Sequence, residues 1–410
     1  MKSDLSCLMQ ERGLDALVVI GPDGLGSANT AFTYFTGGAH VTNGTIVVKR
    51  DGVGTLVHAT MERDEAAKTG LQLISASNYK MSEIIQQCKG DRLAARVEYT
   101  RRLFNDLGVS GRVGFYGADS VGSTFSFLSA LSRAEFVEVI TEYENDVISQ
   151  ARKTKDAQEV AQIRQACRLT EGVIGETRDF LQRHRVADEI LLKQDGTALT
   201  IADVKSFIRR EEAAAGLDDA GCIFAIGRDA GVPHSSGTPA DQIRLGQTIV
   251  FDIFPRLIGG YYADITRTWC LGYAPDDVQA AYELVMKVHD DAAAAFNTQR
   301  FTYEFQDLAC DIFEARGHRT VRQDIGVTNG YVHSLGHGFG LDVHESPGMS
   351  MKGLRPDEKM MPGTIVTNEP GLYYPDKGWG IRVEDDYWCN PETGEFECLT
   401  GFDRGLVVAM

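Results

Sequence analysis

No two cysteines of this chain stand in Cys-x-x-Cys spacing, although the sequence contains eight cysteines. Closely spaced cysteine pairs are the usual mark of structural zinc sites and of redox-active motifs. Scattered single cysteines are more typical of reduced thiols that fill small spaces in a protein core. We therefore expect reduced thiols and no structural zinc.

Long apolar stretches and clusters of basic residues are also missing. No stretch approaches the length of apolar sequence that spans a bilayer, and residues 1–20 are too polar for the apolar core of a secretory signal. Lysine and arginine form no run, and the formal net charge at pH 7 is −17, whereas phosphate binding requires clustered positive charge. We therefore predict a cytoplasmic protein that binds neither nucleic acid nor a membrane.

The length of the chain sets its domain organisation. A chain of 410 residues is too long for one ordinary core, and a strongly helical pattern starts at Val147. We therefore predict two domains, 1–146 and 147–410, the second opening with one long helix over 147–182.

The first domain reads as a compact α/β unit without a catalytic constellation. An opening helix precedes a buried strand at 16–20, and a hairpin turns at Asp51 and Gly52. His40 and His58 are isolated, which is more typical of structural or surface histidines than of ligands. We assign this domain at most a role in shaping the substrate site.

Two aspartates mark a predicted hairpin over 246–269, GQTIVFDIFPRLIGGYYADITRTW. A fold-back near Ile258 would place Asp252 opposite Asp264, with Cβ atoms roughly 5 Å apart. Two like charges that close, among apolar strands, repel each other and are costly to desolvate unless a cation or a shared proton compensates them. A divalent metal would do so; the equally weighted alternative is that one aspartate caps a turn while the other is solvated.

Three of the nine histidines, His333, His337 and His344, lie together in YVHSLGHGFGLDVHE, residues 331–345. The glycines between them argue against a continuous helix, so His333 and His337 do not form the one-face pair of an HExxH zinc protease. Glycine-rich backbone instead suggests close packing against a site. His234 is predicted in a loop, where it fits either a turn residue or a binding group.

Two later strands carry further acidic residues. Glu369 ends a strand predicted at 364–369, and a strand over 381–387 would place Arg382, Glu384 and Asp386 on one face. An arginine beside carboxylates usually forms a salt bridge, and for this strand alone that interpretation stays open. Together the candidate ligands are four carboxylates and one imidazole: Asp252, Asp264, His337, Glu369 and Glu384. Such an oxygen-dominated set suits Mn²⁺ or a similar ion, and five ligands can hold two metals.

With these motifs in place, the chain closely resembles the pita-bread metallopeptidases, in their Xaa-Pro aminopeptidase and prolidase branch. The resemblance is carried by PHSSG, FDIFP, YYADITRT, HSLGHGFGLDVHE, TNEPGLYY and GIRVEDD, which together span residues 233–386. It implies an α/β (α+β) fold, with a creatinase-like N-terminal domain (1–146) and a pita-bread catalytic domain (147–410) made of an antiparallel sheet flanked by helices.

The resemblance also implies a dinuclear metal centre. Asp252 would bind one metal, His337 and Glu369 the other, and Asp264 and Glu384 would bridge the two. A hydroxide held between the ions would attack the scissile carbonyl, and Glu369 can accept its proton. The ions are expected to be Mn²⁺, with Co²⁺, Zn²⁺ or Fe²⁺ as alternatives.

Roles outside the ligand set follow from the same resemblance. His344 and His234 would lie near the carbonyl oxygen and the tetrahedral intermediate, and His333 would help to seat the imino-acid side of the peptide. Arg382 would lie near the substrate or Glu384. The expected substrate is a small peptide cleaved at an Xaa-Pro bond, either a dipeptide or the N-terminus of a longer chain, and the expected assembly is a homodimer.

One departure concerns the spacing of Asp252 and Asp264, which are separated by one residue more than is usual in the family. A longer turn or a β-bulge would absorb the additional residue. A change of register would instead alter the bridging geometry.

Three other functions are compatible with the fold. A dimethylsulfoniopropionate lyase of the same superfamily can keep a metal site, and product analysis with both substrates would distinguish it. A metal-free creatine amidinohydrolase and a non-catalytic binding relative would both lack ligands, and all five ligand positions are intact here.

Overall fold

The chain forms two compact units, Met1–Arg152 and Lys153–Met410, in the computed structural model, which describes residues 1–22, 29–117 and 120–410. We expected the second domain to begin at residue 147, but helix α7 (Val147–Arg152) groups with the first unit. Among the described residues, no helix combines the length and apolarity needed to cross a bilayer.

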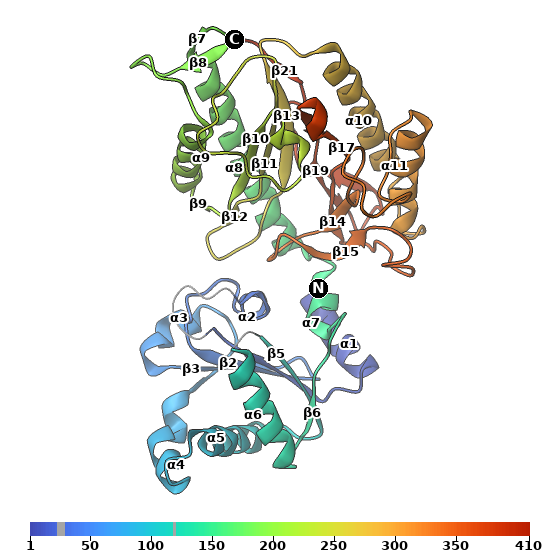
Figure 1. Ribbon diagram of the computed structural model, residues 1–410. Coiled ribbons are helices and arrows are strands. Elements are labelled where there is room, and N and C mark those ends of the chain that lie inside the picture. The colour runs from blue at the N-terminus through green and yellow to red at the C-terminus, as the bar shows by residue number, and fades with distance from the viewer. Residues whose placement is uncertain (23–28, 118–119) are drawn as a thin grey trace. The chain divides into compact units, whose positions relative to one another are not determined.

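The first unit is built on a six-stranded mixed sheet in the order β4-β3-β2-β1-β5-β6 (Figure 1). β1 pairs antiparallel with β2 and parallel with β5, and β3 pairs parallel with β4. The strand expected at 16–20 and the hairpin expected around Asp51 and Gly52 are confirmed. The strands are β1 (Ala16–Ile20), β2 (Gly44–Lys49), β3 (Gly54–His58), β4 (Gln72–Ser75), β5 (Arg112–Gly117) and β6 (Glu138–Ile140).

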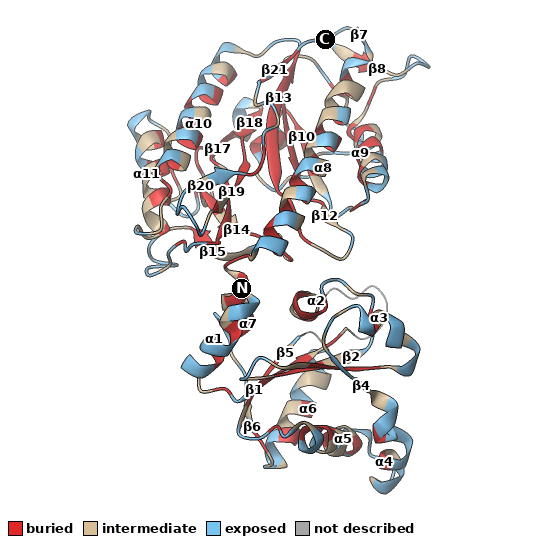
Figure 2. Ribbon diagram, turned by 180° about the vertical axis from the view of Figure 1, so that it is seen from behind, coloured by how far each residue is buried: buried red, intermediate tan, exposed pale blue. Residues whose placement is uncertain are grey.

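Helices cover this sheet, and α4, α5 and α6 lie along one of its faces (Figures 1 and 2). Apolar residues of β1, β2, β3 and β5 pack against apolar residues of these helices in one continuous core. The helices are α1 (Leu5–Glu11), α2 (Thr30–Thr36), α3 (Arg63–Ala67), α4 (Met81–Gln87), α5 (Arg92–Leu107) and α6 (Val121–Arg133), with single turns η1 (Lys2–Asp4), η2 (Thr60–Glu62) and η3 (Ala76–Tyr79).

The second unit contains two larger sheets and three strand pairs. One sheet has the order β10-β11-β13-β21, and the other has the order β15-β14-β16-β19-β20. The first comprises β10 (Cys222–Ile226), β11 (Thr248–Ile253), β13 (Ile265–Leu271) and β21 (Val407–Val408); the second comprises β14 (Gly336–Gly338), β15 (Glu345–Met349), β16 (Ile365–Asn368), β19 (Asp385–Cys389) and β20 (Phe396–Cys398). The pairs are β7 (Arg185–Ala187) with β8 (Ile190–Leu192), β9 (Leu217–Asp218) with β12 (Arg256–Leu257), and β17 (Gly371–Tyr374) with β18 (Trp379–Arg382).

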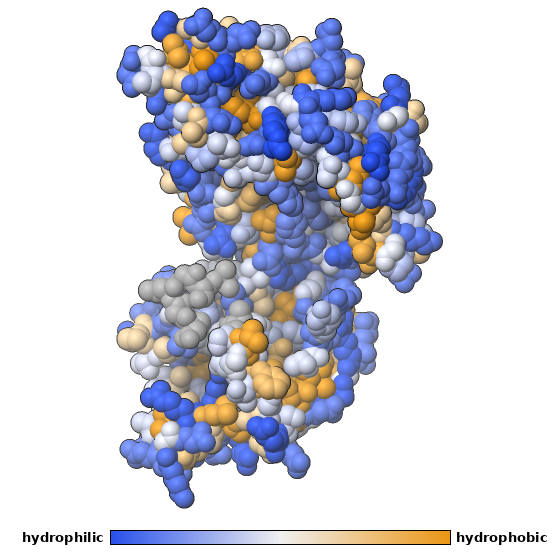
Figure 3. All heavy atoms as spheres, in the orientation of Figure 1, coloured by the Kyte–Doolittle hydropathy of each residue, from blue (hydrophilic) through white to orange (hydrophobic). Residues whose placement is uncertain are grey.

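Two helix pairs flank these sheets on opposite sides of the second unit (Figure 1). α8 (Ala157–Gln182) and α9 (Ile201–Ala215) share a core with β10, β11 and β13, whereas α10 (Asp276–Ala295) and α11 (Tyr303–Ala315) share a core with the other sheet and with β17 and β18. Single turns lie at η4 (Asp229–Gly231) and η5 (Pro375–Lys377). The central strands are buried (Figure 2), while hydrophilic residues cover most of the visible face of this unit (Figure 3). This arrangement confirms a mixed α/β fold.

The prediction of one long helix over 147–182 is wrong, because the helix is interrupted between α7 and α8. Thr154 forms a β-bridge with Thr364, and the Lys155 backbone N–H donates to Gly363 O at 2.9 Å. Asp156 then caps α8, accepting hydrogen bonds from two backbone N–H groups of its first turn. The interruption therefore follows from a long-range pairing and a capping residue that apolar periodicity does not reveal.

The register predicted for the hairpin of Asp252 and Asp264 is also wrong. Asp252 pairs with Thr266, so Asp264 lies two residues away from the opposite position and just before β13. The connection is longer than a tight turn because β12 leaves the hairpin to pair with β9. The shift by two residues preserves the side-chain parity of the strand, so both aspartates still point to one face.

The continuous strand expected over 381–387 is divided between two sheets. β18 ends at Arg382 and β19 begins at Asp385, and the Glu384 backbone N–H donates to Thr266 O at 3.1 Å. Glu384 therefore lies at a crossing between the sheet of β13 and the sheet of β19.

Candidate metal centre

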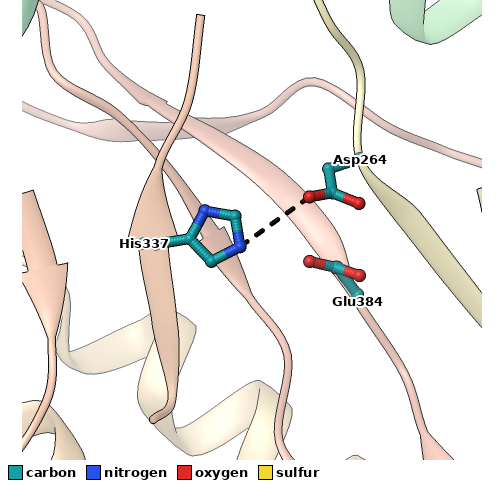
Figure 4. A group of neighbouring side chains, drawn as sticks. All are labelled: Asp264, His337 and Glu384. Atoms are coloured by element: carbon teal, nitrogen blue, oxygen red, sulfur yellow. Dashed lines mark ion pairs between the residues drawn. The ribbon is translucent and has the colours of Figure 1, made fainter. Parts of the chain in front are cut away.

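The five candidate ligands come from both larger sheets of the second unit and are mostly buried. Asp252 lies on β11, Asp264 precedes β13, His337 lies on β14, Glu369 follows β16, and Glu384 joins β18 to β19. Side chains of Asp264, His337 and Glu384 point toward one another (Figure 4), and each has a potential ligand atom within 4.8 Å of the others. The fold thus brings together residues more than 100 positions apart in sequence.

His337 is oriented toward the carboxylates. Its Nδ1 lies 3.1 Å from Gly338 O and therefore donates to that carbonyl, which leaves the lone pair of Nε2 available. Nε2 lies 3.4 Å from Glu369 Oε1 and 3.7 Å from Asp264 Oδ2. An imidazole with Nδ1 fixed by a backbone carbonyl and Nε2 directed at carboxylates is a suitable ligand for a cation.

The two carboxylate oxygens of Asp252 have different surroundings: one is in an ion pair, and the other has no hydrogen-bond partner among the described residues. Its Oδ2 forms an ion pair with Arg382 Nη2 at 2.5 Å. Its Oδ1 is buried and accepts no hydrogen bond from any residue that the structure describes. A buried carboxylate oxygen without a donor is costly, and a metal ion at this oxygen would remove that cost.

The electrostatics of the cluster favour a bound cation. Burial and the neighbouring carboxylates raise the pKa of Asp264 and of Glu369 well above their usual values, and raise the pKa of Glu384 to about 8. Burial and the neighbouring His344 lower the pKa of His337 to about 3. Ionisation of these carboxylates is therefore unfavourable without a nearby positive charge, and a divalent ion would supply that charge.

Arg382, Thr266 and Tyr373 support the cluster. Thr266 Oγ1 donates to Glu384 Oε2 at 2.7 Å and accepts from Arg382 Nε at 3.1 Å. Arg382 Nη1 donates to the Tyr373 hydroxyl at 2.7 Å. Arg382 and Glu384 both contact the Thr266 hydroxyl, and Arg382 forms its ion pair with Asp252. This ion pair arises because β18 packs beside β11, a long-range arrangement that strand periodicity does not predict.

His333 belongs to the same network. Its Nδ1 donates to Ser334 O at 2.7 Å. Its Nε2 therefore accepts a hydrogen bond from the Tyr373 hydroxyl, which lies 2.8 Å away. Burial, followed by the positive charge of Arg382, lowers the pKa of His333 to about 3. His333 is therefore a neutral acceptor whose ring orientation is set by Tyr373.

Thr266 and Tyr373 were not predicted from the sequence. Thr266 follows Asp264 by two residues and shares its strand face, which was an available signal. Tyr373 carried no such signal, because its role depends on the pairing of β17 with β18.

Beneath Glu384, a second ion pair fixes the backbone. Arg267 Nη2 and Asp385 Oδ1 lie 2.8 Å apart, and both side chains are almost fully buried. Arg267 Nη1 also donates to Glu384 O at 2.7 Å. Asp386 Oδ2 accepts from the Asp264 backbone N–H at 3.3 Å. These contacts restrain the two backbone segments that carry Asp264 and Glu384.

His344 and His234 are both exposed. The ring centroid of His344 lies 4.3 Å from that of His337. Burial, and then the charge of His234, lower the pKa of His344. The structure thus brings His344 beside the cluster, while His234 interacts with it electrostatically from the loop that follows η4.

The chain is similar to several peptidases. It is 28% identical over 279 residues to the peptidase YqhT of Bacillus subtilis, covering 67% of this chain and 69% of that one. It is 25% identical over 385 residues to the Xaa-Pro dipeptidase of Pyrococcus furiosus, covering 92% and 91%. The structure of an X-Pro aminopeptidase from Thermotoga maritima has the same fold, with a TM-score of 0.72, 21% identity and coverage of 100% and 99%.

A family model matches more than half of the chain. The matched residues, 161–391, include all five candidate ligands and the segments that position them. The chain therefore belongs to metallopeptidase family M24.

Proposed function

We propose that this chain is a dinuclear metal-dependent peptidase that hydrolyses Xaa-Pro bonds. Family membership makes it a metallopeptidase and implies divalent metal ions. The proline specificity is supported by the Xaa-Pro dipeptidase of Pyrococcus furiosus, which aligns with 92% of the chain. The observation that carries the proposal is the convergence of Asp264, His337 and Glu384 from three separate segments.

Asp252, Asp264, His337, Glu369 and Glu384 are the proposed ligands of two ions. Five donors can hold two ions, and the four carboxylates among them suit Mn²⁺. When bound, the ions would polarise the scissile carbonyl and lower the pKa of a water molecule. Two observations support this assignment: Oδ1 of Asp252 has no hydrogen-bond donor among the described residues, and the lone pair of His337 Nε2 is available.

The chain's own residues have distinct proposed roles in the reaction. Glu369 accepts the proton released when water adds to the carbonyl carbon, and passes it to the departing proline nitrogen as the C–N bond breaks. His344, beside His337 but exposed, donates a hydrogen bond to the carbonyl oxygen as negative charge develops there. His234 lies near the same oxygen, and His333 faces the proline side.

The proposed specificity has a physical basis in the substrate. An Xaa-Pro bond is a tertiary amide without an N–H donor, and the proline ring has a nearly fixed shape. A rigid ring suits a preformed wall, and the hydrogen bonds of His333 to Ser334 and Tyr373 hold its imidazole in one orientation. From the resemblance we also propose a homodimer located in the cytoplasm, which sedimentation and cell fractionation would test.

Metal loading combined with substrate comparison tests the proposal. Protein stripped by chelation and reloaded with Mn²⁺ should contain two ions per chain, and should cleave Gly-Pro and Xaa-Pro-Xaa peptides but not Xaa-Ala controls. Asp264→Asn should lose metal and activity together, whereas Asp357→Asn, at an exposed position of the same unit, should retain both.

Activity that survives complete metal removal would refute the metal-dependent mechanism. Equal cleavage of Xaa-Ala and Xaa-Pro bonds would refute the specificity. One ion per chain at full activity would refute the dinuclear centre while leaving the peptidase assignment intact.

A further inference from the structure

His289 is a buried histidine that has no part in the reaction proposed above. It lies on the buried face of α10 and is 0% exposed. Burial of an imidazole is costly unless polar groups contact its ring nitrogens. Both nitrogens have such a contact: Nδ1 lies 3.3 Å from Asp290 Oδ1, and Nε2 lies 3.2 Å from Asp385 Oδ2. The ring of His289 is therefore placed by polar contacts as well as by apolar packing.

The contact between His289 and Asp385 is electrostatic. The two atoms lie at ion-pair distance, but neither forms a hydrogen bond of ordinary geometry with any residue that the structure describes. Positive charge also reaches Asp385 from Arg404, whose Nε lies 2.8 Å from Oδ2, and from Arg267, whose Nη2 lies 2.8 Å from Oδ1. Of these three contacts, the one with His289 couples the position of Asp385 to helix α10.

The backbone of His289 contacts a second buried residue. Asn368 Nδ2 donates a hydrogen bond to His289 O at 2.9 Å. A carbonyl oxygen only accepts, so the nitrogen of the Asn368 amide is the atom that faces it. Asn368 is 0% exposed, which shields this bond from water. One position on α10 therefore contacts Asn368 through its carbonyl and Asp385 through its ring.

Asn368 and Asp385 lie opposite each other in the sheet. They are the last residue of β16 and the first residue of β19, and they pair in register. Glu369 directly follows Asn368, and Glu384 directly precedes Asp385. Because the ladder between β16 and β19 ends at this pair, the contacts of His289 act where the two glutamates leave the sheet.

We propose that His289 is a positioning residue, which sets the separation of Glu369 and Glu384 by holding Asn368 and Asp385. The inference rests on the proposed function, because it takes both glutamates as metal ligands. Partners outside a metal's ligand set orient the ligands, and their loss typically weakens metal binding by about 10- to 100-fold. His289 acts through the backbone of the neighbouring residues, so we expect an effect near the lower end of this range.

Metal titration of the full-length protein tests the proposal without substrate. Protein stripped by chelation is titrated with Mn²⁺, and the affinity of each ion is measured by equilibrium dialysis. His289→Leu, which has an apolar side chain of similar size, should weaken the binding of at least one ion by about tenfold. His289→Gln should restore most of that affinity, because its amide N–H can donate to Asp385.

Val288→Ala is the matched control for a loss of stability alone. Val288 precedes His289 on α10, is 0% exposed and belongs to the apolar core beside the sheet of β16 and β19. Its truncation leaves a cavity, so the melting temperature should fall. The Mn²⁺ affinity of this variant should nevertheless equal that of wild type, because Val288 has no polar side chain with which to hold Asn368 or Asp385.

Asn368→Ala tests the other contact of His289. It breaks the bond to His289 O and also removes an amide oxygen that has no hydrogen-bond partner among the described residues, so the variant should fold. If Asn368 links Glu369 to α10, this variant should weaken Mn²⁺ binding about as much as His289→Leu does.

Three results would overturn the proposal. These are wild-type Mn²⁺ affinity in His289→Leu, equal losses of affinity in His289→Leu and His289→Gln, and an equal loss in Val288→Ala. If His289→Leu does not fold, Asn368→Ala decides, and wild-type affinity in that variant would refute the proposal. The ion content of wild type and its cleavage of Xaa-Pro peptides are measured separately, so failure of the proposed function is distinguishable from failure of this inference.

Discussion

Arg382 and Asp252 form a buried ion pair, in which Arg382 Nη2 lies 2.5 Å from Asp252 Oδ2. The arginine carries the main positive charge beside a cluster of carboxylates. Burial lowers its pKa, but Tyr373 and those carboxylates outweigh burial and raise the pKa of Arg382 well above its usual value. Its Nε and Nη1 are committed to Thr266 and Tyr373. The hydrogen-bond donors of Arg382 are therefore used mainly by protein groups. This makes Arg382 a residue that supports the metal site more than one that binds substrate.

Replacement of Arg382 by methionine should destabilise the metal-free protein by about 3–5 kcal/mol, because removing one partner leaves a buried charge uncompensated. Urea unfolding after chelation measures this loss. Activity toward an Xaa-Pro dipeptide and toward a longer Xaa-Pro peptide should fall to the same extent.

Arg256→Met is the control, because Arg256 forms a partly exposed ion pair with Asp218 in the same unit. It should change stability by less than about 1 kcal/mol. A KM that rises for the dipeptide alone in Arg382→Met would show instead that Arg382 binds the substrate carboxylate.

Tyr373→Phe should lower the free energy of unfolding by about 1–3 kcal/mol, since it leaves His333 Nε2 without its donor and Arg382 Nη1 with only the longer contact to Pro233 O at 3.5 Å. It should also raise KM for Xaa-Pro peptides, because the His333 ring loses the contact that orients it. Tyr143→Phe, at an exposed tyrosine, provides the comparison. An unchanged KM would remove His333 from the proposed proline wall.

His344→Ala should lower kcat roughly 100-fold while metal content stays near two ions per chain, because a group that stabilises the developing oxyanion acts on the transition state. The His344 ring lies beside the His337 ring at an interplanar angle of 57°, and His344 is not one of the three clustered residues. Metal analysis alongside kinetics separates the two roles, with His40→Ala at an exposed position of the first unit as control. Loss of metal together with activity would make His344 a ligand.

Glu212 makes stability dependent on pH. Its side chain is buried in α9, neither carboxylate oxygen has a hydrogen-bond partner among the described residues, and burial, with the charge of Asp219, raises its pKa to about 7. A carboxyl that binds its proton more tightly in the folded state loses stability as pH rises from its unfolded pKa, near 4.5, to its folded pKa. The loss is complete above that folded value.

Glu212→Gln removes this titration. The variant should therefore be more stable than wild type by about 2 kcal/mol at pH 8 and nearly equal to it at pH 4. Urea unfolding at both pH values measures the difference, and Glu211→Gln is the adjacent control. A stability difference that does not change between the two pH values would contradict a raised pKa.

Much of the local structure was predictable from sequence. The strand Ala16–Ile20 was predicted with its bounds, because apolar periodicity acts over a few residues. The long helix failed at Lys153–Asp156, where the chain instead pairs with Gly363 and Thr364. Local pattern does not report such a long-range contact.

The chemical types of the candidate ligands were likewise determined by the sequence alone, because carboxylates and histidines within apolar strands are costly without a partner. Only the tertiary structure determines which residues are the partners of these ligands. It pairs Asp252 with Arg382 and places Thr266, not Asp264, opposite Asp252. It also sets Glu384 at a crossing between two sheets. Register and the packing of one sheet against another depend on contacts between residues far apart in the chain, which periodicity along a single strand does not encode.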